Sequence, residues 1–282
     1  GLVNAPTGSG KTYALWIACV LEFLRDHQKH EVKPELQVLW VTPLRALAKD
    51  IHRAMQQFCD DIDLRWNVGL RTGDTPTSER QKQKKVSPQA LVITPESLHI
   101  LLSQKDYPYY FKHLKSIIVD EWHEIIGTKR GVATELAISK LKNITKSELK
   151  VWGISATIGN LKQAKRVLLG EDLYKDGVEI KSEVEKEIEI ESVLPDEVEK
   201  FPWSGFLGTK LLPKIIPLIK KNNTTLLFTN TRSQTELWYQ AILKESPDLA
   251  GIIAMHHGSM DHDLRTWVED ALHANKLKLV VC

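Results

Sequence analysis

A segment near the start of the chain has the composition of a phosphate-binding loop. It reads APTGSGKT from Ala5 to Thr12 and lies between the apolar run LVNA and a helical run. Glycines let the backbone approach phosphate oxygens, whose charge the loop amides and the amino end of the helix then meet. We expect Lys11 to neutralise the β and γ phosphates of a nucleotide and the Thr12 hydroxyl to hold Mg²⁺. Ala5 stands where the general motif has glycine, and a simple glycine-rich turn is the alternative.

Two acidic residues end a buried apolar run further along the chain. Asp120 and Glu121 follow SIIV and open the sequence DEWH. A carboxylate at the end of a buried strand beside a phosphate loop is where a magnesium ligand is needed. We expect Asp120 to orient Mg²⁺ through water and Glu121 to polarise the attacking water, although two acidic residues at a strand end are common by themselves. The residues expected to bind nucleotide are Thr7, Gly8, Ser9, Gly10, Lys11, Thr12 and Asp120.

The sequence does not support several other common chemistries. It contains no GxSxG nucleophile elbow, and GSGKTY lacks the third glycine of a dinucleotide fingerprint. His256 and His257 are adjacent, so they lack the spacing of two metal ligands on one helix face. Cys19, Cys59 and Cys282 are too few and too scattered for a disulfide framework or a cysteine-rich zinc site, and we expect buried thiols in a reducing compartment.

Short apolar runs alternate with helical patterns over the first 170 residues. Runs that are apolar on both faces suit buried parallel strands. They are LVNA (2–5), QVLWVT (37–42), ALVIT (90–94), SIIVD (116–120) and KVWGIS (150–155). Helical spacing covers 12–25, 44–58, 96–103 and 132–142, the last with an apolar stripe of Val132, Ala133, Leu136, Ala137 and Leu141. The repeated order predicts a doubly wound α/β fold.

The pattern changes after about residue 170. Residues 174–200 contain ten acidic and four basic residues around KEIEIES, whose alternation is typical of a half-exposed strand. The connector LPDEVEKFPWSGFLG follows. We therefore expect a first domain over 1–195, in which 171–195 form a peripheral strand and linker.

A second α/β pattern then starts and is unfinished at the last residue, over 196–282. Strands are expected at 224–229, 251–255 and 277–282, with helices at 232–244 and 261–274. In the second of these helices, one face is expected to carry Leu264, Trp267, Val268, Ala271 and Leu272. Both domains are expected to have parallel sheets. The absence of Met at position 1 and the final run LKLVVC lead us to expect a piece of a longer protein.

Composition excludes several classes of protein. The 282 residues are 42% hydrophobic and 26% charged, as in ordinary globular domains, which excludes disorder as the main state. No stretch approaches the roughly 18 apolar residues of a membrane span, so no membrane partner is expected and the chain is expected inside the cell. The net charge of +2 does not by itself demand nucleic acid.

The motifs, taken in order, resemble those of a superfamily 2 helicase of the DExH type. They are APTGSGKT, TPLRALAKD, RTGDT, TPESL, DEWH, SAT, LLFTNTRSQTE and HHGS. DEWHE, the following KRG, VWGISATIGN and FPW are similar to the large helicase-related (Lhr) proteins, and within them to the bacterial ligase-associated subgroup. The resemblance implies two RecA-like P-loop domains, ATP and Mg²⁺ as ligands, and a single nucleic-acid strand that crosses both domains.

The resemblance also implies roles for individual residues. His123 joins Lys11, Asp120 and Glu121 in the catalytic set, with Ser155 and Thr157 coupling the nucleotide site to the strand. The strand path is expected to include Pro43, Arg45, Arg71, Thr72, Gly73, Thr94 and Pro95 in the first domain, and Thr229, Asn230, Thr231, Arg232, His257, Gly258 and Ser259 in the second. Amides, hydroxyls and arginines suit phosphate contacts without base reading, whereas each alone is more often a cap or turn.

Three further features are weighed against a structural role. RQKQKK at 80–85 could touch nucleic acid, although a solvated helix face is favoured. The eight tryptophans are expected in the core. Trp122 and Trp203 are treated as exceptions because they lie in family motifs.

The resulting expectation is an ATP-dependent helicase or translocase in the bacterial cytoplasm or nucleoid. Movement from 3′ to 5′ on DNA, a role in repair and a DNA ligase as partner follow from the resemblance alone. An RNA-remodelling ATPase and a nucleotide-gated binding module without turnover are the alternatives. After HHGS the only arginine is Arg265, so the 282 residues alone are expected to hydrolyse ATP weakly without an arginine finger.

Overall fold

A computed structural model describes residues 1–26, 32–146, 148–156, 158–182, 188–195 and 208–282. The chain divides into two compact units, Gly1–Glu187 and Ile188–Cys282. The sequence places the division eight residues later, after residue 195.

The first unit is built on a seven-stranded sheet in which all strand pairs are parallel. The strand order is β3-β4-β2-β5-β6-β1-β7. The strands are β1 (Leu2–Asn4), β2 (Val38–Val41), β3 (Val68–Arg71), β4 (Ala90–Ile93), β5 (Ser116–Val119), β6 (Lys150–Ser155) and β7 (Glu179–Lys181). The five apolar runs expected as strands are β1, β2, β4, β5 and β6, and the α/β class is confirmed. β3 and β7 lie in more polar sequence, which gave no strand signal at those positions.

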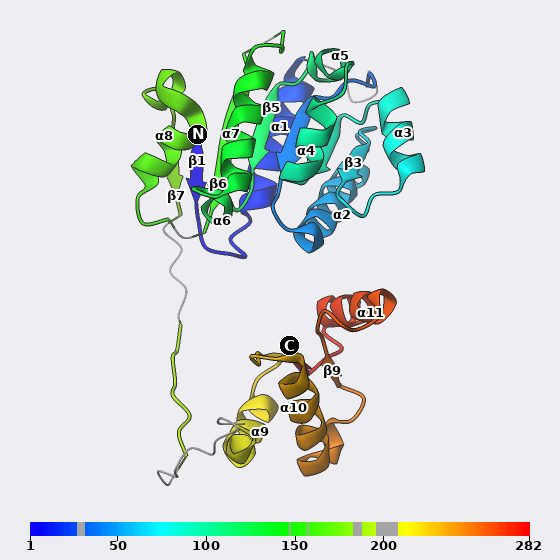
Figure 1. The fold of residues 1–282 in the computed structure, drawn as a ribbon, viewed down its shortest axis with the longest axis vertical. Helices are drawn as coiled ribbons and strands as arrows, with labels where there is room; N and C mark the ends of the chain where they lie inside the picture. Colours follow the sequence, from blue (N-terminus) through cyan, green and yellow to red (C-terminus); the bar gives the residue numbers. More distant parts are fainter. Residues whose placement is uncertain (27–31, 147, 157, 183–187, 196–207) are drawn as a thin grey trace. The chain divides into compact units, whose positions relative to one another are not determined.

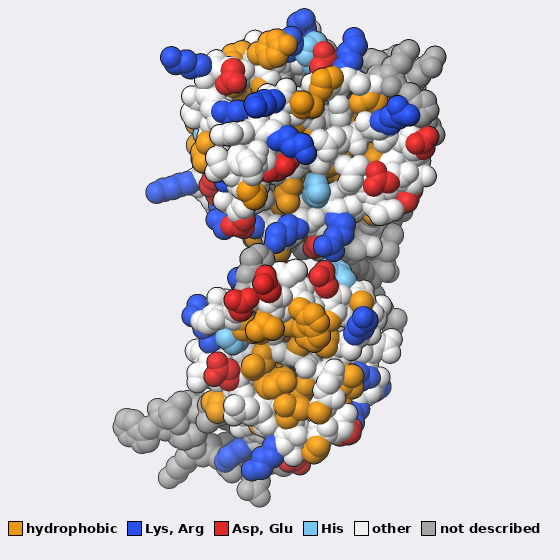
Figure 2. Space-filling model, turned by 90° about the vertical axis from the view of Figure 1, so that its right-hand side faces the viewer, with side chains coloured by type: hydrophobic (Ala, Val, Ile, Leu, Met, Phe, Trp, Pro, Cys, Tyr) orange, Lys and Arg blue, Asp and Glu red, His pale blue; other side chains and the backbone are white. Residues whose placement is uncertain are grey.

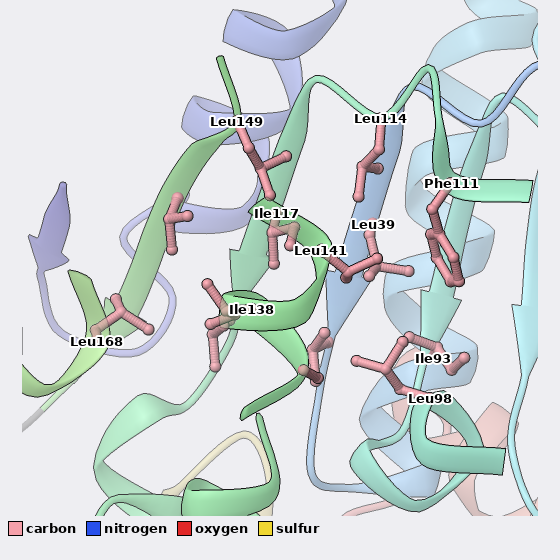
Figure 3. Packing of buried hydrophobic residues seen from close by; sticks show 14 of the residues in the cluster. Leu39, Ile93, Leu98, Phe111, Leu114, Ile117, Ile138, Leu141, Leu149 and Leu168 are labelled. Atoms are coloured by element: carbon pink, nitrogen blue, oxygen red, sulfur yellow. The ribbon is translucent and has the colours of Figure 1, made fainter. Parts of the chain in front are cut away.

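Helices cover both faces of this sheet (Figure 1). Alternate residues of the central strands point to opposite faces. Leu39 and Ile117 therefore pack with α4 (Pro95–Leu102), α7 (Lys129–Lys142) and α8 (Leu161–Tyr174), as Figure 3 shows for part of this core. Trp40 and Ile118 pack on the other side with α1 (Lys11–Asp26) and α2 (Arg45–Asp61). Shorter helices are α3 (Thr77–Lys85), α5 (Tyr107–Phe111) and α6 (Trp122–Ile125).

The parallel register brings the carboxyl ends of the strands to one edge of the sheet. Val41 pairs with both Ile93 and Val119, and Arg71 pairs with Ile93. Asn4 pairs with Ser155. The loops that follow β1, β2, β3, β4 and β5 therefore meet along this edge, and ligands of open α/β sheets bind there.

The structure corrects three expectations about the first unit. The buried face of α7 carries Thr134, Ala137, Ile138 and Leu141, whereas Val132 and Leu136 are 51% and 63% exposed. The helix starts at Lys129, whereas the sequence predicts a start at residue 132. Ile138 packs into the core beside Ala137, so the buried stripe is rotated from the expected one. Trp122 is a fully buried core residue whose Nε1 donates to the Ala164 carbonyl at 3.1 Å, so it is no exception to core packing.

The prediction of a strand at KEIEIES is also wrong for the residues of this segment that the structure describes. Residues 188–192 form no strand, and Ile188 and Ile190 are exposed; residues 186 and 187 lie outside the described residues. The peripheral strand is β7 instead, which pairs in parallel with β1. Acidic residues flank both KEIEIES and β7, so charge alone did not show which of the two segments forms the strand. Trp203 also lies outside the described residues.

The second unit contains a three-stranded parallel sheet in the order β8-β10-β9. The strands are β8 (Thr225–Leu227), β9 (Ile253–Met255) and β10 (Leu279–Val281). Leu279 and Val281 pack with α9 (Leu212–Lys221) and α10 (Arg232–Glu245), while Val280 packs with α11 (His262–His273). One-turn 3₁₀ helices occupy Thr209–Leu211 and Pro247–Leu249. All three strands and both helices expected in this region are present within a few residues of their expected bounds.

The apolar face of α11 is only half buried. Val268 and Ala271 contact the sheet, whereas Leu264 and Trp267 are 57% and 58% exposed. Figure 2 shows hydrophobic side chains gathered on a face of the second unit. The apolar face predicted for α11 is therefore broader than the face that is buried, because the small sheet covers only part of it.

Two sequence-based exclusions can be examined in the same structure. In the described part of the chain, no helix has the length and apolar character needed to cross a membrane. All three cysteines are free thiols, and burial raises the pKa of Cys19 to about 11 and that of Cys59 to about 12. Both thiols therefore remain protonated at neutral pH and are weak nucleophiles.

Candidate functional site

The phosphate loop connects β1 directly to α1. Gly8 and Gly10 have φ angles of 76° and 82°, a region that residues with a side chain rarely adopt. The Ser9 amide donates to the Pro6 carbonyl at 3.3 Å, which closes the turn ahead of the helix. A Cβ added at Gly10 would meet no atom within 4 Å, so the backbone there faces open space. The loop thus leaves room for a ligand against the amino end of α1.

Lys11 is the first residue of α1 and is only 9% exposed. Its Nζ is buried and has no hydrogen-bond partner among the residues that the structure describes. A buried ammonium without a partner is costly, and anionic oxygens would offset that cost. The side chain therefore fits a phosphate group bound in the loop.

Asp120 follows β5 and is almost fully buried. Burial, followed by the neighbouring charge of Glu121, raises the pKa of this carboxyl group to about 6. The Glu121 amide donates to Oδ1 at 2.9 Å and the Trp40 indole Nε1 donates to Oδ2 at 3.4 Å, and both contacts favour the charged form. At neutral pH the group is mostly a carboxylate, which fits a bound divalent cation.

Glu121 has a φ of 46°, which is uncommon for a residue with a side chain. This left-handed conformation turns the chain sharply from β5 into α6. The Glu121 carboxylate lies 3.4 Å from Nδ1 of His123, and the same nitrogen lies 3.1 Å from the Ser155 hydroxyl. Nε2 of His123 lies 3.4 Å from Glu124. His123 thus connects Glu121 to Ser155 at the end of β6.

The phosphate-loop, acidic and coupling residues that are described all lie at the carboxyl edge of one sheet. Thr157, the second expected coupling residue, lies outside the described residues. Thr7 and Thr12 are on the exposed or half-buried side of the loop, where Thr12 enters α1. Phosphate and Mg²⁺ fit this arrangement, since an unpartnered ammonium, an open glycine turn, a hydroxyl and a carboxylate converge on one edge.

The seven strand-path residues of the first unit differ in accessibility. Arg45 and Gly73 are exposed at the same edge of the sheet. The others are buried, namely Pro43, Arg71, Thr72, Thr94 and Pro95. Thr94 donates its hydroxyl to Ser97 at 3.1 Å and precedes α4, and Pro95 is the first residue of that helix. These two residues shape the loop in this structure.

Arg71 is the least accessible of the candidate cations in the first unit. It is 3% exposed, and burial lowers the pKa of its guanidinium group. Its Nη1 has no hydrogen-bond partner in the described part of the structure. A phosphate could contact Nη1 only after the surrounding groups move.

The loop after β3 carries Gly73 and its neighbours to the surface. Arg45, the first residue of α2, pairs with Asp74 through Nη1 and Oδ1 at 2.9 Å. A Cβ added at Gly73 would lie 3.0 Å from Nη2 of Arg45. The loop backbone and the Arg45 guanidinium are thus direct neighbours at the surface.

The second unit gathers its seven strand-path residues where β8 and β9 end. Thr229 donates to the Thr231 carbonyl at 3.1 Å, and Thr231 caps α10 by accepting from the Gln234 amide. Arg232 donates to the Ser259 hydroxyl. The Ser259 amide donates to Nδ1 of His257 at 3.3 Å, and Gly258 lies beside Arg232. Asn230, the seventh, is part of the same loop and donates its amide to the Gln234 side chain. Hydroxyls, amides and one guanidinium therefore cluster on one edge.

Sequence reasoning missed three residues that hold these loops. Trp40 donates to Asp120, Glu124 lies beside His123, and Arg80 donates to the loop after β3. Glu124 directly follows the DEWH motif, which was a usable signal. A tryptophan within an aliphatic strand gave none, and Arg80 was assigned with its basic neighbours to a solvated face.

Comparison with known proteins places this chain in a family. Residues 2–165, more than half of the chain, match the DEAD/DEAH box helicase family, and the chain belongs to that family. It is 34% identical over 297 aligned residues to the ATP-dependent helicase Lhr-Core protein 2 of Thermococcus barophilus, which covers 99% of this chain and 34% of the relative. It is 26% identical to the Lhr helicase/uracil glycosylase of Escherichia coli, with 99% and 22% coverage. The chain thus spans about a third or less of these relatives.

Solved structures with the same fold include relatives bound to nucleic acid. The helicase Lhr of Mycobacterium smegmatis, bound to single-stranded DNA and AMP-PNP, is similar with a TM-score of 0.76 and 27% identity, covering 99% of this chain and 37% of that one. The DEAD-box helicase Mss116 bound to single-stranded RNA has a TM-score of 0.74 at 19% identity, with 100% and 56% coverage. The latter shares the fold. The expected RecA-like helicase fold is confirmed by these comparisons.

Proposed function

We propose that the chain carries the nucleotide site and part of the strand path of an ATP-dependent nucleic-acid helicase or translocase. The observation that supports this most directly is the buried, unpartnered Nζ of Lys11 beside an open glycine turn. The carboxylates of Asp120 and Glu121 lie at the same sheet edge. The family of the chain and the AMP-PNP bound to the related Lhr structure agree with this proposal.

In this proposal each site residue of the first unit has one role. The loop amides and Lys11 bind the phosphates of ATP. Glu121 orients the attacking water and accepts its proton, because its carboxylate is less buried than that of Asp120 and lies at the same sheet edge. His123 and Ser155 transmit the state of the site to the edge where the strand binds. Thr12 and Asp120 would hold Mg²⁺, which when bound neutralises charge on the phosphate oxygens.

The strand would bind by its phosphates. Arg45 and the amide edge at Gly73 are exposed in the first unit, and Arg232 with Ser259 forms a second contact group in the other unit. These groups contact phosphate oxygens without reading base edges, so affinity depends on salt more than on sequence.

DNA is proposed as the substrate, with movement from 3′ to 5′ and a role in repair. Support comes from the single-stranded DNA bound to the related Lhr structure and from the ligase-associated motifs of the sequence. A DNA ligase is the proposed partner, and the cytoplasm or nucleoid is the proposed compartment. An RNA-remodelling ATPase is the second candidate, because a structure with the same fold holds single-stranded RNA.

The experiment compares labelled DNA and RNA oligonucleotides of the same base order by fluorescence anisotropy. Each is titrated with the chain in Mg²⁺, with and without AMP-PNP. We expect tighter binding to DNA and a change in strand affinity when the nucleotide is present, because binding at two coupled sites is reciprocal. Tighter RNA binding would support the RNA-remodelling candidate, and identical affinity with and without nucleotide would argue against a coupled motor.

A further inference from the structure

Arg80 of α3 makes contacts with a neighbouring loop, unlike the exposed Lys84 of the same helix. Arg80 directs Nη2 toward the loop after β3 and donates to the carbonyls of Thr72 at 3.1 Å and Gly73 at 2.9 Å. Lys84, one turn further along the helix, is exposed to solvent. The basic stretch at 80–85 therefore combines a loop-binding arginine with solvated lysines.

The two carbonyl contacts help to fix which way the loop amides point. A trans peptide directs its C=O and its N–H to opposite sides. Since the carbonyls of Thr72 and Gly73 face Arg80, the amides of Gly73 and Asp74 face away from it. The Asp74 amide donates to the Thr72 hydroxyl at 3.3 Å. The exposed Gly73 amide has no acceptor among the described residues, so it is available to an external anion.

Two further contacts hold the base of the same loop. The Thr75 hydroxyl accepts from the Thr72 amide at 2.9 Å and donates to the Leu70 carbonyl at 3.3 Å. The amide group of Gln83, which is buried, donates to the same Leu70 carbonyl at 3.1 Å. The Thr75 amide also donates to the Thr72 carbonyl at 3.3 Å, so Arg80 shares the Thr72–Gly73 peptide with the turn and is the side chain that holds the Gly73 carbonyl.

The available amide lies next to an exposed cation. The Arg45 guanidinium approaches the Gly73 position so closely that a Cβ there would lie 3.0 Å from Nη2. An exposed backbone donor beside a guanidinium group suits a phosphate oxygen. Replacing Gly73 would crowd that contact, which is one reason for glycine at this position.

We infer that Arg80 is a positioning residue for strand binding, which aims the Gly73 amide at a phosphate of the strand without touching the strand itself. This inference rests on the proposed binding of a single strand at the RTGDT loop. The role of Arg80 differs from that of Arg45, whose exposed guanidinium would contact phosphate directly. It also differs from that of Lys84, which would add only a distant charge.

The test uses the whole chain and a labelled oligothymidylate in anisotropy titrations over a range of salt concentrations. Arg80→Met should weaken binding about three- to tenfold, the effect of one lost hydrogen bond. The slope of log affinity against log salt should stay equal to the parent's, because no phosphate contact is removed. Arg80→Lys should restore most of the affinity, since an ammonium can also donate to two carbonyls.

Lys84→Met is the matched control, because it removes the same charge from an exposed position of the same helix. Hydrogen exchange of the free proteins adds a direct readout of the loop. The Asp74 amide, which donates to the Thr72 hydroxyl in the parent, should exchange faster in Arg80→Met than in the parent or in Lys84→Met. Thermal unfolding of each variant shows whether the fold is retained, and Arg80→Gln takes the place of Arg80→Met if the latter is unfolded.

Three outcomes are decisive. Equal affinities of Arg80→Met and Lys84→Met, with the fold retained, overturn the inference. A salt slope reduced by about 0.7 in Arg80→Met also overturns it, because that is the effect of removing one direct phosphate contact from a single-strand complex. Failure of the parent itself to bind any strand counts against the proposed function, whereas the exchange of the loop amides still reports on Arg80.

Discussion

Lys11 and Asp120 place opposite charges in positions almost completely removed from water. Their burial is costly in the free protein, because a buried charge loses its hydration. The cost differs between them: the Lys11 ammonium has no described hydrogen-bond partner, whereas Asp120 accepts bonds from Trp40 and from the Glu121 amide. Both residues therefore have an energetic signature that can be measured without substrate.

Asp120→Asn should stabilise the chain at neutral pH. The pKa of Asp120 is raised from 3.8 to about 6, so between these values the folded protein binds more protons than the unfolded chain. The stability of the parent therefore falls as pH rises through this interval, and above about pH 6 the charged carboxylate costs about 1–3 kcal/mol. Urea unfolding with EDTA should show the variant and the parent converging below about pH 4.

The control for this prediction is Asp176→Asn, which changes an exposed aspartate of the same unit. Its stability should follow that of the parent across the same pH range. If the difference in unfolding free energy between Asp120→Asn and the parent is no larger at pH 7.5 than at pH 4, burial of a charged carboxylate is the wrong account of this site.

Glu121→Gln should separate binding from hydrolysis. The substitution keeps the size of the side chain and removes the carboxylate that would accept a proton from water. Phosphate release under single-turnover conditions should fall about 10²- to 10⁴-fold, the usual contribution of a general base. ATP affinity should change little, and an unchanged rate of phosphate release would assign the base to another residue.

At the level of elements, the sequence predicted the five interior strands of the first sheet and missed its two edge strands, β3 and β7. β2, β4 and β5 are continuous apolar runs, so their period and length left few alternatives. β3 reads VGLR and β7 reads EIK, and their pairing depends on neighbouring strands rather than on their own composition. The site motifs were readable because they occupy loops at the ends of well-predicted strands, whereas the contacts made by Trp40 and Arg80 required the packed structure.

The orientation of α7 gives a test at this scale. Ile138 is buried in the core seen in Figure 3, whereas Leu136 is 63% exposed, although both are large and apolar. Ile138→Ala should lower the free energy of unfolding by about 2–5 kcal/mol, because it leaves a cavity. Leu136→Ala should change it by less than about 0.5 kcal/mol. Urea unfolding of both variants decides the matter, and a larger loss for Leu136→Ala would restore the orientation expected from the sequence.

For the molecule as a whole, strand contacts are expected from both units. The first unit offers Arg45 and the amide of Gly73, and the second offers Arg232, His257 and Ser259. These contacts are local to each unit, and no base-reading group is required of either. The whole chain should therefore bind strands of different sequence with similar affinity.

Arg232→Ala should weaken binding by a similar factor for every strand sequence. Removing one phosphate contact should reduce the salt slope by about 0.7 for a single strand. Anisotropy titrations with thymidine-rich, adenine-rich and mixed oligonucleotides provide the measurement, with Lys244→Ala on the same helix as a control for charge. A strong preference for one sequence that disappears in Arg232→Ala would contradict a backbone-tracking account.

The central claim is that ATP phosphates bind against Lys11 in the first unit. Calorimetric titration of the chain with MgATP tests it most directly, with Lys11→Ala and, as control, Lys105→Ala, which removes a lysine from an exposed turn. We predict that Lys11→Ala weakens MgATP binding at least about tenfold, since a charge-assisted contact contributes roughly 1.5–3 kcal/mol, while Lys105→Ala binds like the parent. Equal affinity of the parent and Lys11→Ala would contradict the account of the nucleotide site.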